Sequence, residues 1–165
     1  MINNKIILIT GGAGFIGSAL IRNIINDTDH SVINIDKLSY SGSLQSLESI
    51  ESDSRYIFEQ IDICNADSLL EIIQKYKPDI VMHLAAESHV DRSIDNPGEF
   101  IQNNIVGTFN LLEKTKKYWL SLSGDKKENF KFLYVSTDEV YGDLDVKDTF
   151  FTEDSRYKPS SPYSA

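Results

Sequence analysis

The fold of this chain is decided by the stretch Lys5-Ile6-Ile7-Leu8-Ile9-Thr10-Gly11-Gly12-Ala13-Gly14-Phe15-Ile16-Gly17. Its first six residues form an apolar, β-branched run that is typical of a buried strand. The glycine-rich part follows at once, and Ser18 to Asp27 then carries apolar side chains at helical spacing. The stretch therefore predicts a strand, a tight turn and a helix.

An acid completes this pattern. A second apolar run ends in Asp36, about 20 residues after the glycines, as in dinucleotide-binding folds. Glycines let the backbone approach a pyrophosphate, the helix N-terminus offers free N–H groups, and the acid accepts from a ribose diol. Without this context the glycines would predict only an ordinary turn. Asp36 favours NAD over NADP, but Lys37 keeps NADP open because a cation tolerates a 2′-phosphate.

Strand-like and helix-like segments alternate along the rest of the chain. This alternation predicts an α/β fold with a doubly wound parallel sheet of the Rossmann type, in strand order 3-2-1-4-5. Ligands then bind at the carboxyl ends of the strands. We expect strands near 5–10, 32–36, 56–61, 80–86 and 130–136, helices near 15–27, 44–50, 66–76 and 99–121, a charged surface turn at 124–129 and a helix opening at 160–162.

Length and composition allow one domain and exclude several kinds of partner. The chain has 165 residues, a net charge of −9 and one cysteine, Cys64. A nucleic-acid surface needs clustered lysine and arginine, and no such stripe is present. A disulfide framework and a metal site lack the necessary residues, so we expect no bound metal. The chain offers neither a membrane-length apolar run nor a signal peptide, so we expect a cytoplasmic protein.

Polar residues at strand ends are the candidates for chemistry. Asp62 and Ile63 follow the third strand and either contact an adenine or simply end the strand in solvent. Asp138 and Glu139 are adjacent acids beyond the fifth strand. Such a pair can supply one acid and one base, although the same residues also suit a helix N-cap or a solvated loop. Tyr163 is an acid/base candidate only with a nearby cation, and is otherwise a packed aromatic.

The chain resembles the extended short-chain dehydrogenase/reductase family, and within it the dTDP-glucose 4,6-dehydratases. Asp138 and Glu139 are the most specific part of this resemblance, because related 4-epimerases carry small residues there. The resemblance runs almost end to end through 9–18, 34–38, 83–93, 104–108, 135–142 and 159–165.

The resemblance implies dehydration of dTDP-glucose to a 4-keto-6-deoxy sugar with NAD as cofactor. Tyr163 takes the proton of the C4 hydroxyl, Glu139 is the base at C5, and Asp138 protonates the departing C6 hydroxyl. Thr137 and Ser88 hold the sugar or the nicotinamide side. The implied cofactor contacts are Gly11, Gly14, Phe15, Ile16, Gly17, Asp36, Lys37, Leu38, Ser39, Asp62, Ile63, Leu84, Ala85, Ala86, Ser88 and Asn103, the last standing where the family has threonine.

The resemblance also implies missing parts. The family carries a lysine four positions after the catalytic tyrosine, further strands and a substrate domain. We therefore expect an incomplete NAD-binding domain over 1–165, inactive by itself, from a parent that pairs as a homodimer through the helix at 99–121. Two alternatives remain, namely another nucleotide-sugar enzyme such as a 4-epimerase or other dehydratase, and a non-catalytic NAD-binding module.

Overall fold

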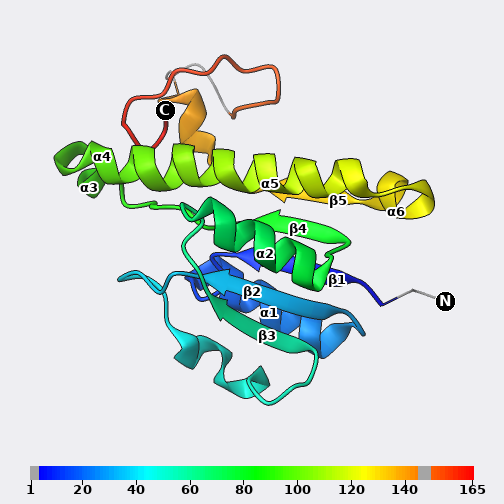
Figure 1. The fold of residues 1–165 in the computed structure, drawn as a ribbon. Helices are drawn as coiled ribbons and strands as arrows, with labels where there is room; N and C mark the ends of the chain where they lie inside the picture. Colours follow the sequence, from blue (N-terminus) through cyan, green and yellow to red (C-terminus); the bar gives the residue numbers. More distant parts are fainter. Residues whose placement is uncertain (1–3, 145–149) are drawn as a thin grey trace.

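A five-stranded parallel sheet forms the centre of the computed structural model, which describes residues 4–144 and 150–165 (Figure 1). The strand order is β3-β2-β1-β4-β5, which confirms the predicted doubly wound topology. The elements are β1 Ile6–Thr10, α1 Phe15–Asp27, β2 Ser31–Asp36, η1 Leu44–Ile50, β3 Tyr56–Gln60, α2 Ala66–Tyr76, β4 Ile80–His83, α3 Val90–Asp95, α4 Pro97–Phe100, η2 Ile101–Gly107, α5 Thr108–Ser121, α6 Gly124–Asn129, β5 Lys131–Tyr134 and η3 Asp138–Tyr141.

Alternating side chains of the strands build a core on each face of the sheet. On β1, Ile7 and Ile9 pack with α1 and η1, whereas Leu8 packs with α2 and α5. All three are almost fully buried. Because both faces are covered, the central strands are mostly apolar, as expected for a parallel sheet, with Thr10, Asn34 and His83 as buried polar exceptions. Figure 1 shows α1 behind the sheet and the long α5 running across the other side.

The strand register brings residues from distant parts of the sequence to one edge. Thr10 pairs with Ile35 of β2 and with His83 of β4, and His83 pairs with Tyr134 of β5. All strands run in the same direction, so their carboxyl ends and the loops that follow them meet there. This edge is where the fold binds ligands.

The long helix differs in detail from its prediction. It starts with α4 at Pro97, passes through the π-helical segment η2 and continues as α5 to Ser121. Proline suits the first turn of a helix because it lacks the N–H that would stay unpaired there. The short helix α3 precedes it, in a segment for which we predicted no helix.

The predicted surface turn at 124–129 is wrong, because these residues form the helix α6. None of its residues is buried, so no apolar periodicity marks it. A tertiary contact holds it instead: the indole Nε1 of Trp119 donates to the carbonyl of Lys127 at 3.1 Å, and the Lys127 ammonium lies over the indole ring. Asn129 also bonds back to the Asp125 carbonyl.

At the predicted helix opening the chain makes one turn. The backbone N–H of Ala165 donates to the carbonyl of Ser161 at 3.1 Å, and the Ser164 hydroxyl bonds to the backbone N–H groups of Ser160 and Ser161. This turn carries Tyr163 toward the sheet edge. In the described ranges, every helix is too short or too polar to cross a membrane.

Candidate functional site

The glycine-rich turn comes so close to the loop after β4 that side chains cannot fit. Gly11 has a φ of +73°, and a Cβ on it would lie 2.6 Å from the backbone nitrogen of Ala85. A Cβ on Gly17 would overlap the carbonyl oxygen of Gly11. Both positions thus require glycine. The turn leads directly into α1, whose N-terminal N–H groups face the sheet edge and suit an anion such as a pyrophosphate.

Asp36 is held beneath this turn by backbone donors. Its Oδ2 accepts from the N–H of Ala13 at 3.0 Å, and its Oδ1 accepts from the N–H of Leu38 at 2.8 Å. Leu38 adopts a φ of +58°, which bends the chain away after the acid. Two N–H donors stabilise the charged carboxylate, and its remaining lone pairs are free to accept from a ribose diol.

A cavity of about 630 Å³ runs along the carboxyl edge of the sheet. It joins the glycine turn, the ends of β2 and β4, the segment η2 and the loop after β5. Most of the predicted site residues lie around this one cavity. Those among its lining are Gly11, Gly14, Phe15, Ile16, Gly17, Asp36, Lys37, Ser39, Ile63, Leu84, Ala85, Ala86, Ser88, Asn103, Thr137 and Tyr163.

Four predicted residues lie outside that lining. Leu38 faces away from it, although its N–H orients Asp36. Asp62 accepts from the backbone N–H of Cys64 at 2.8 Å, which fits a strand-end turn. Asp138 and Glu139 have exposed side chains in the described structure. Their predicted roles in cofactor binding and catalysis stay predictions.

The candidate catalytic stretch begins a 3₁₀ turn. The hydroxyl of Thr137 caps this turn by accepting from the N–H of Glu139 at 3.2 Å. Thr137 lines the cavity, whereas the side chains of the two acids are exposed and lie outside its lining. Tyr163 reaches the cavity from the last turn of the chain and packs edge-on against Phe100, with ring centroids 6.5 Å apart.

A buried polar chain supports the floor of the site. The Thr10 hydroxyl lies 2.7 Å from Nδ1 of His83, whose Nε2 lies 2.9 Å from the Thr108 hydroxyl. Thr10 also accepts from the N–H of Ala85 at 3.2 Å. Burial lowers the pKa of His83 to about 4, so the imidazole is neutral near pH 7. The ring stacks on Tyr134 and thereby joins β1, β4, β5 and α5.

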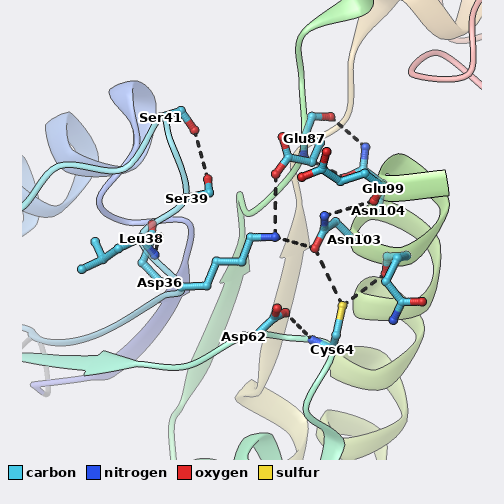
Figure 2. A network of polar contacts seen from close by, with 12 residues as sticks. Asp36, Leu38, Ser39, Ser41, Asp62, Cys64, Glu87, Glu99, Asn103 and Asn104 are labelled. Carbon is cyan, nitrogen blue, oxygen red and sulfur yellow. Dashed lines mark hydrogen bonds and ion pairs between the residues drawn. The ribbon is translucent and has the colours of Figure 1, made fainter. Parts of the chain in front are cut away.

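Sequence reasoning missed two residues beside Asn103. Glu87 is 3% exposed and lines the cavity, and its carboxylate lies 3.7 Å from the Lys37 ammonium (Figure 2). Asn104 holds Glu87 in place, because its amide accepts from the Glu87 N–H and donates to the Glu87 carbonyl, both at 2.8 Å. Glu87 could have been identified from the sequence, because it is an acid that directly follows the strand predicted at 80–86.

In the part of the chain that the structure describes, no three His, Cys, Asp or Glu side chains cluster closely enough to hold a metal ion. The polar side chains among the described lining of the cavity carry hydroxyls, carboxylates, amides and the ammonium group of Lys37.

Comparisons with known proteins agree with this geometry. Residues 8–165 match the family model described as GDP-mannose 4,6 dehydratase. The dTDP-glucose 4,6-dehydratase of Neisseria gonorrhoeae is 58% identical over 161 residues, which are 98% of this chain and 46% of that protein. The dTDP-glucose 4,6-dehydratase of Escherichia coli is 58% identical in an alignment of 167 residues, which covers 96% of this chain and 46% of that protein. The chain thus spans about half the length of the curated relatives it matches.

Solved structures give the same result. The DesIV dTDP-glucose 4,6-dehydratase from Streptomyces venezuelae, solved with NAD and TYD bound, has a TM-score of 0.85 and 36% identity over 96% of this chain and 47% of that one. The UDP-Glc/GlcNAc 4-epimerase from Campylobacter jejuni has a TM-score of 0.84 and 30% identity, and the match covers 98% of this chain and 45% of that one. The resemblance noted from the sequence is confirmed, and the chain belongs to the GDP-mannose 4,6 dehydratase family, in which it corresponds to about half of a dTDP-glucose 4,6-dehydratase.

Proposed function

We propose that the chain binds NAD in the cavity at the carboxyl edge, and that the protein to which it corresponds dehydrates dTDP-glucose to dTDP-4-keto-6-deoxyglucose. One observation carries this proposal. The glycine turn and Asp36 line the same cavity as Thr137 and Tyr163, so a cofactor and a sugar can meet there. The relatives that bear this activity by name match nearly the whole chain.

The described residues fit a dinucleotide. The close approach of Gly11 and Gly17 leaves room for a pyrophosphate at the N-terminus of α1, and Asp36 faces the position of a ribose diol. Leu84, Ala85 and the exposed ring of Phe15 add apolar walls. When bound, NAD supplies the hydride acceptor and donor for the carbon centres of the sugar.

The side chains would carry the proton transfers. Tyr163 takes the proton of the C4 hydroxyl as that carbon is oxidised to a ketone. The ketone would acidify the C5 hydrogen, which Glu139 would remove, while Asp138 would donate a proton to the C6 hydroxyl that leaves as water. Glu139 would give the proton back to C5 when C6 receives hydride, which yields the 4-keto-6-deoxy sugar. Adjacent acids in one loop can hold these opposite roles when a bound substrate gives their carboxyls different surroundings. Thr137 and Ser88 line the cavity, and in this proposal they would orient the sugar.

The cofactor part of the proposal is tested with the 165-residue chain. Titration with NAD⁺ in a calorimeter should show saturable binding at one site. An Asp36→Ala variant should weaken it strongly, and the absence of saturable binding to the folded wild-type chain would overturn the proposal.

The reaction is tested by product analysis. Mass spectrometry of dTDP-glucose incubated with NAD and the full-length parent should show loss of one water. We expect no turnover from the 165-residue chain, which lacks about half of the relatives' length. A 4-epimer of unchanged mass would support a 4-epimerase instead, a function favoured by the similarity to epimerase structures but not by the adjacent acids.

We further propose that the protein pairs with a second copy through an exposed apolar face of η2 and α5, where Ile101 and Ile105 also border the cavity. Ile101, Ile105 and Phe109 are each more than half exposed on this face, and Leu112 and Leu120 extend it. An exposed apolar stripe of this kind on a helix suits a helix–helix interface. Sedimentation analysis of the chain would measure the association.

A further inference from the structure

Lys37 is the residue that left the choice between NAD and NADP open in the sequence. It follows Asp36 directly and lines the cavity. Among the described residues of the lining, it is also the only lysine or arginine. A 2′-phosphate on the adenosine ribose would need a cation at this edge, because Asp36 would repel it. Whether Lys37 can serve that purpose is therefore decided by its partners.

Two residues hold the Lys37 ammonium. It donates to Oδ1 of Asn103 at 2.7 Å, and Glu87 faces it at 3.7 Å (Figure 2). The amide of Asn103 has a fixed orientation, because its Nδ2 donates to the Glu99 carbonyl at 3.0 Å. A flipped amide would direct N–H groups at an ammonium. Asn103 is thus positioned as an acceptor for Lys37.

Glu87 cancels the charge that Lys37 brings. Its side chain is buried, and its backbone is held on both sides by Asn104. The Lys37 side chain is 32% exposed and that of Glu87 is 4% exposed, so this partly buried pair is screened less than a surface pair and Glu87 offsets the charge of Lys37. Asp36, Lys37 and Glu87 together leave this edge of the cavity with one net negative charge.

Building on the proposed cofactor site, we propose that Asn103 and Glu87 determine the selectivity for NAD over NADP by keeping Lys37 away from the ribose edge. Asn103 fixes the position of the ammonium and Glu87 neutralises it. Asp36 then acts alone on the ribose, where it accepts from a diol and repels a phosphate. Lys37 follows β2, Glu87 follows β4 and Asn103 lies in η2. The selectivity for NAD therefore depends on how these three elements pack.

The test compares the dissociation constants for NAD⁺ and NADP⁺ in the same 165-residue chain. Glu87→Gln should lower the ratio of the NADP⁺ constant to the NAD⁺ constant about five- to tenfold, the size of one ordinary hydrogen bond. In a Lys37→Met background the same substitution should change the ratio much less, because only the repulsion from Glu87 itself remains. The ratio does not depend on the folded fraction, so a destabilised variant stays informative.

Glu59→Gln is the matched control. Glu59 also pairs with a lysine, Lys75, at 2.8 Å, but it lies outside the cavity lining, so its loss should leave the ratio unchanged. An unchanged ratio in Glu87→Gln, or an equal change with and without Lys37, would overturn this inference while NAD⁺ binding still supported the proposed function. A folded wild-type chain that binds neither nucleotide would overturn both.

Discussion

The backbone N–H of Ala13 donates to Oδ2 of Asp36 at 3.0 Å, which ties the glycine-rich turn to the end of β2. The acid therefore has two functions that can be separated. It supports the shape of the turn, and it presents a negative charge to the cavity. Both depend on the same carboxylate, whose other oxygen is engaged by the N–H of Leu38.

Asp36→Asn should weaken both functions. An amide NH₂ group replaces one carboxylate oxygen, so it faces the backbone N–H of Ala13 or Leu38 and cannot accept a hydrogen bond from it. We expect the free energy of unfolding to fall by about 1–2 kcal/mol, measured by urea denaturation, and NAD⁺ affinity to fall at least about tenfold, since a charge-assisted contact is lost. Asp79→Asn is the control, because Asp79 accepts from the N–H of Ile6 at 2.9 Å at the opposite edge of the sheet. It should lose stability and keep NAD⁺ affinity; equal losses of affinity in both variants would contradict the assigned role of Asp36.

Gly17→Ala should disrupt the turn, because the new Cβ overlaps the Gly11 carbonyl and lies 2.7 Å from Cα of Gly12. We expect loss of measurable NAD⁺ binding and a lower urea midpoint. Gly98→Ala, within the helix α4, is the matched change: a Cβ there meets nothing within 4 Å. It should leave binding unchanged and raise stability by up to about 1 kcal/mol, since alanine favours helix. Retained binding in Gly17→Ala would show that the turn can relax.

The neutral His83 should make stability depend on pH. Its pKa is about 4 in the folded chain, below the ordinary value of 6.5, because burial disfavours the imidazolium. Between these values the unfolded chain binds more protons, so stability is complete above pH 6.5 and falls as the pH is lowered toward 4. From pH 7 to pH 5 this group should remove about 2 kcal/mol of stability.

His83→Gln isolates that contribution, because glutamine can hydrogen-bond but does not titrate. The variant should be less stable at pH 7, yet lose about 2 kcal/mol less than the wild type between pH 7 and pH 5. Urea denaturation at both pH values measures the difference. The same loss in the two proteins would mean that other groups account for the acid sensitivity.

Phe109→Glu should separate the proposed dimer. Phe109 is 60% exposed in the single chain and lies in the middle of the apolar stripe on η2 and α5. A carboxylate in a helix–helix interface would be desolvated without a partner, whereas on an exposed monomer face it is tolerated. Sedimentation velocity should show that the variant is a monomer. Urea denaturation should give a midpoint close to that of the wild type, which shows that the variant is folded. Lys117→Glu is the control, because Lys117 is exposed on α5 and lies outside the stripe. This variant should remain a dimer. A wild-type protein that sediments as a monomer would refute the proposed pairing.

The prediction of the fold succeeded where the signal was local. The apolar run before Gly11 and the helical spacing after Ser18 lie within a few turns of chain, and they gave β1 and α1 nearly to the residue. The predicted helix at 66–76 is α2, and Asn65 caps it with a side chain that accepts a hydrogen bond from the N–H of Ser68. The strand order followed because right-handed crossovers leave few topologies for alternating strands and helices.

The prediction failed where no apolar periodicity marks an element. The helix α6 has no buried residue and depends on the bond from Trp119 to Lys127. The π-helical segment η2 has no local signal either, and it places both Asn103 and Asn104 at the cavity. The adjacent acids Asp138 and Glu139 were identified as a pair, but the sequence did not show that they begin a 3₁₀ turn capped by Thr137.

The sequence by itself determined the cofactor signature. Gly11, Gly17 and Asp36 act through backbone geometry and charge, and these properties belong to the residues and their spacing. The tertiary structure alone decided what surrounds Lys37, because its partner Asn103 lies 66 positions away and Glu87 comes from another strand end. The charge of a lysine can be read from sequence. Whether that charge is available to a ligand depends on which acceptors the packing brings to it.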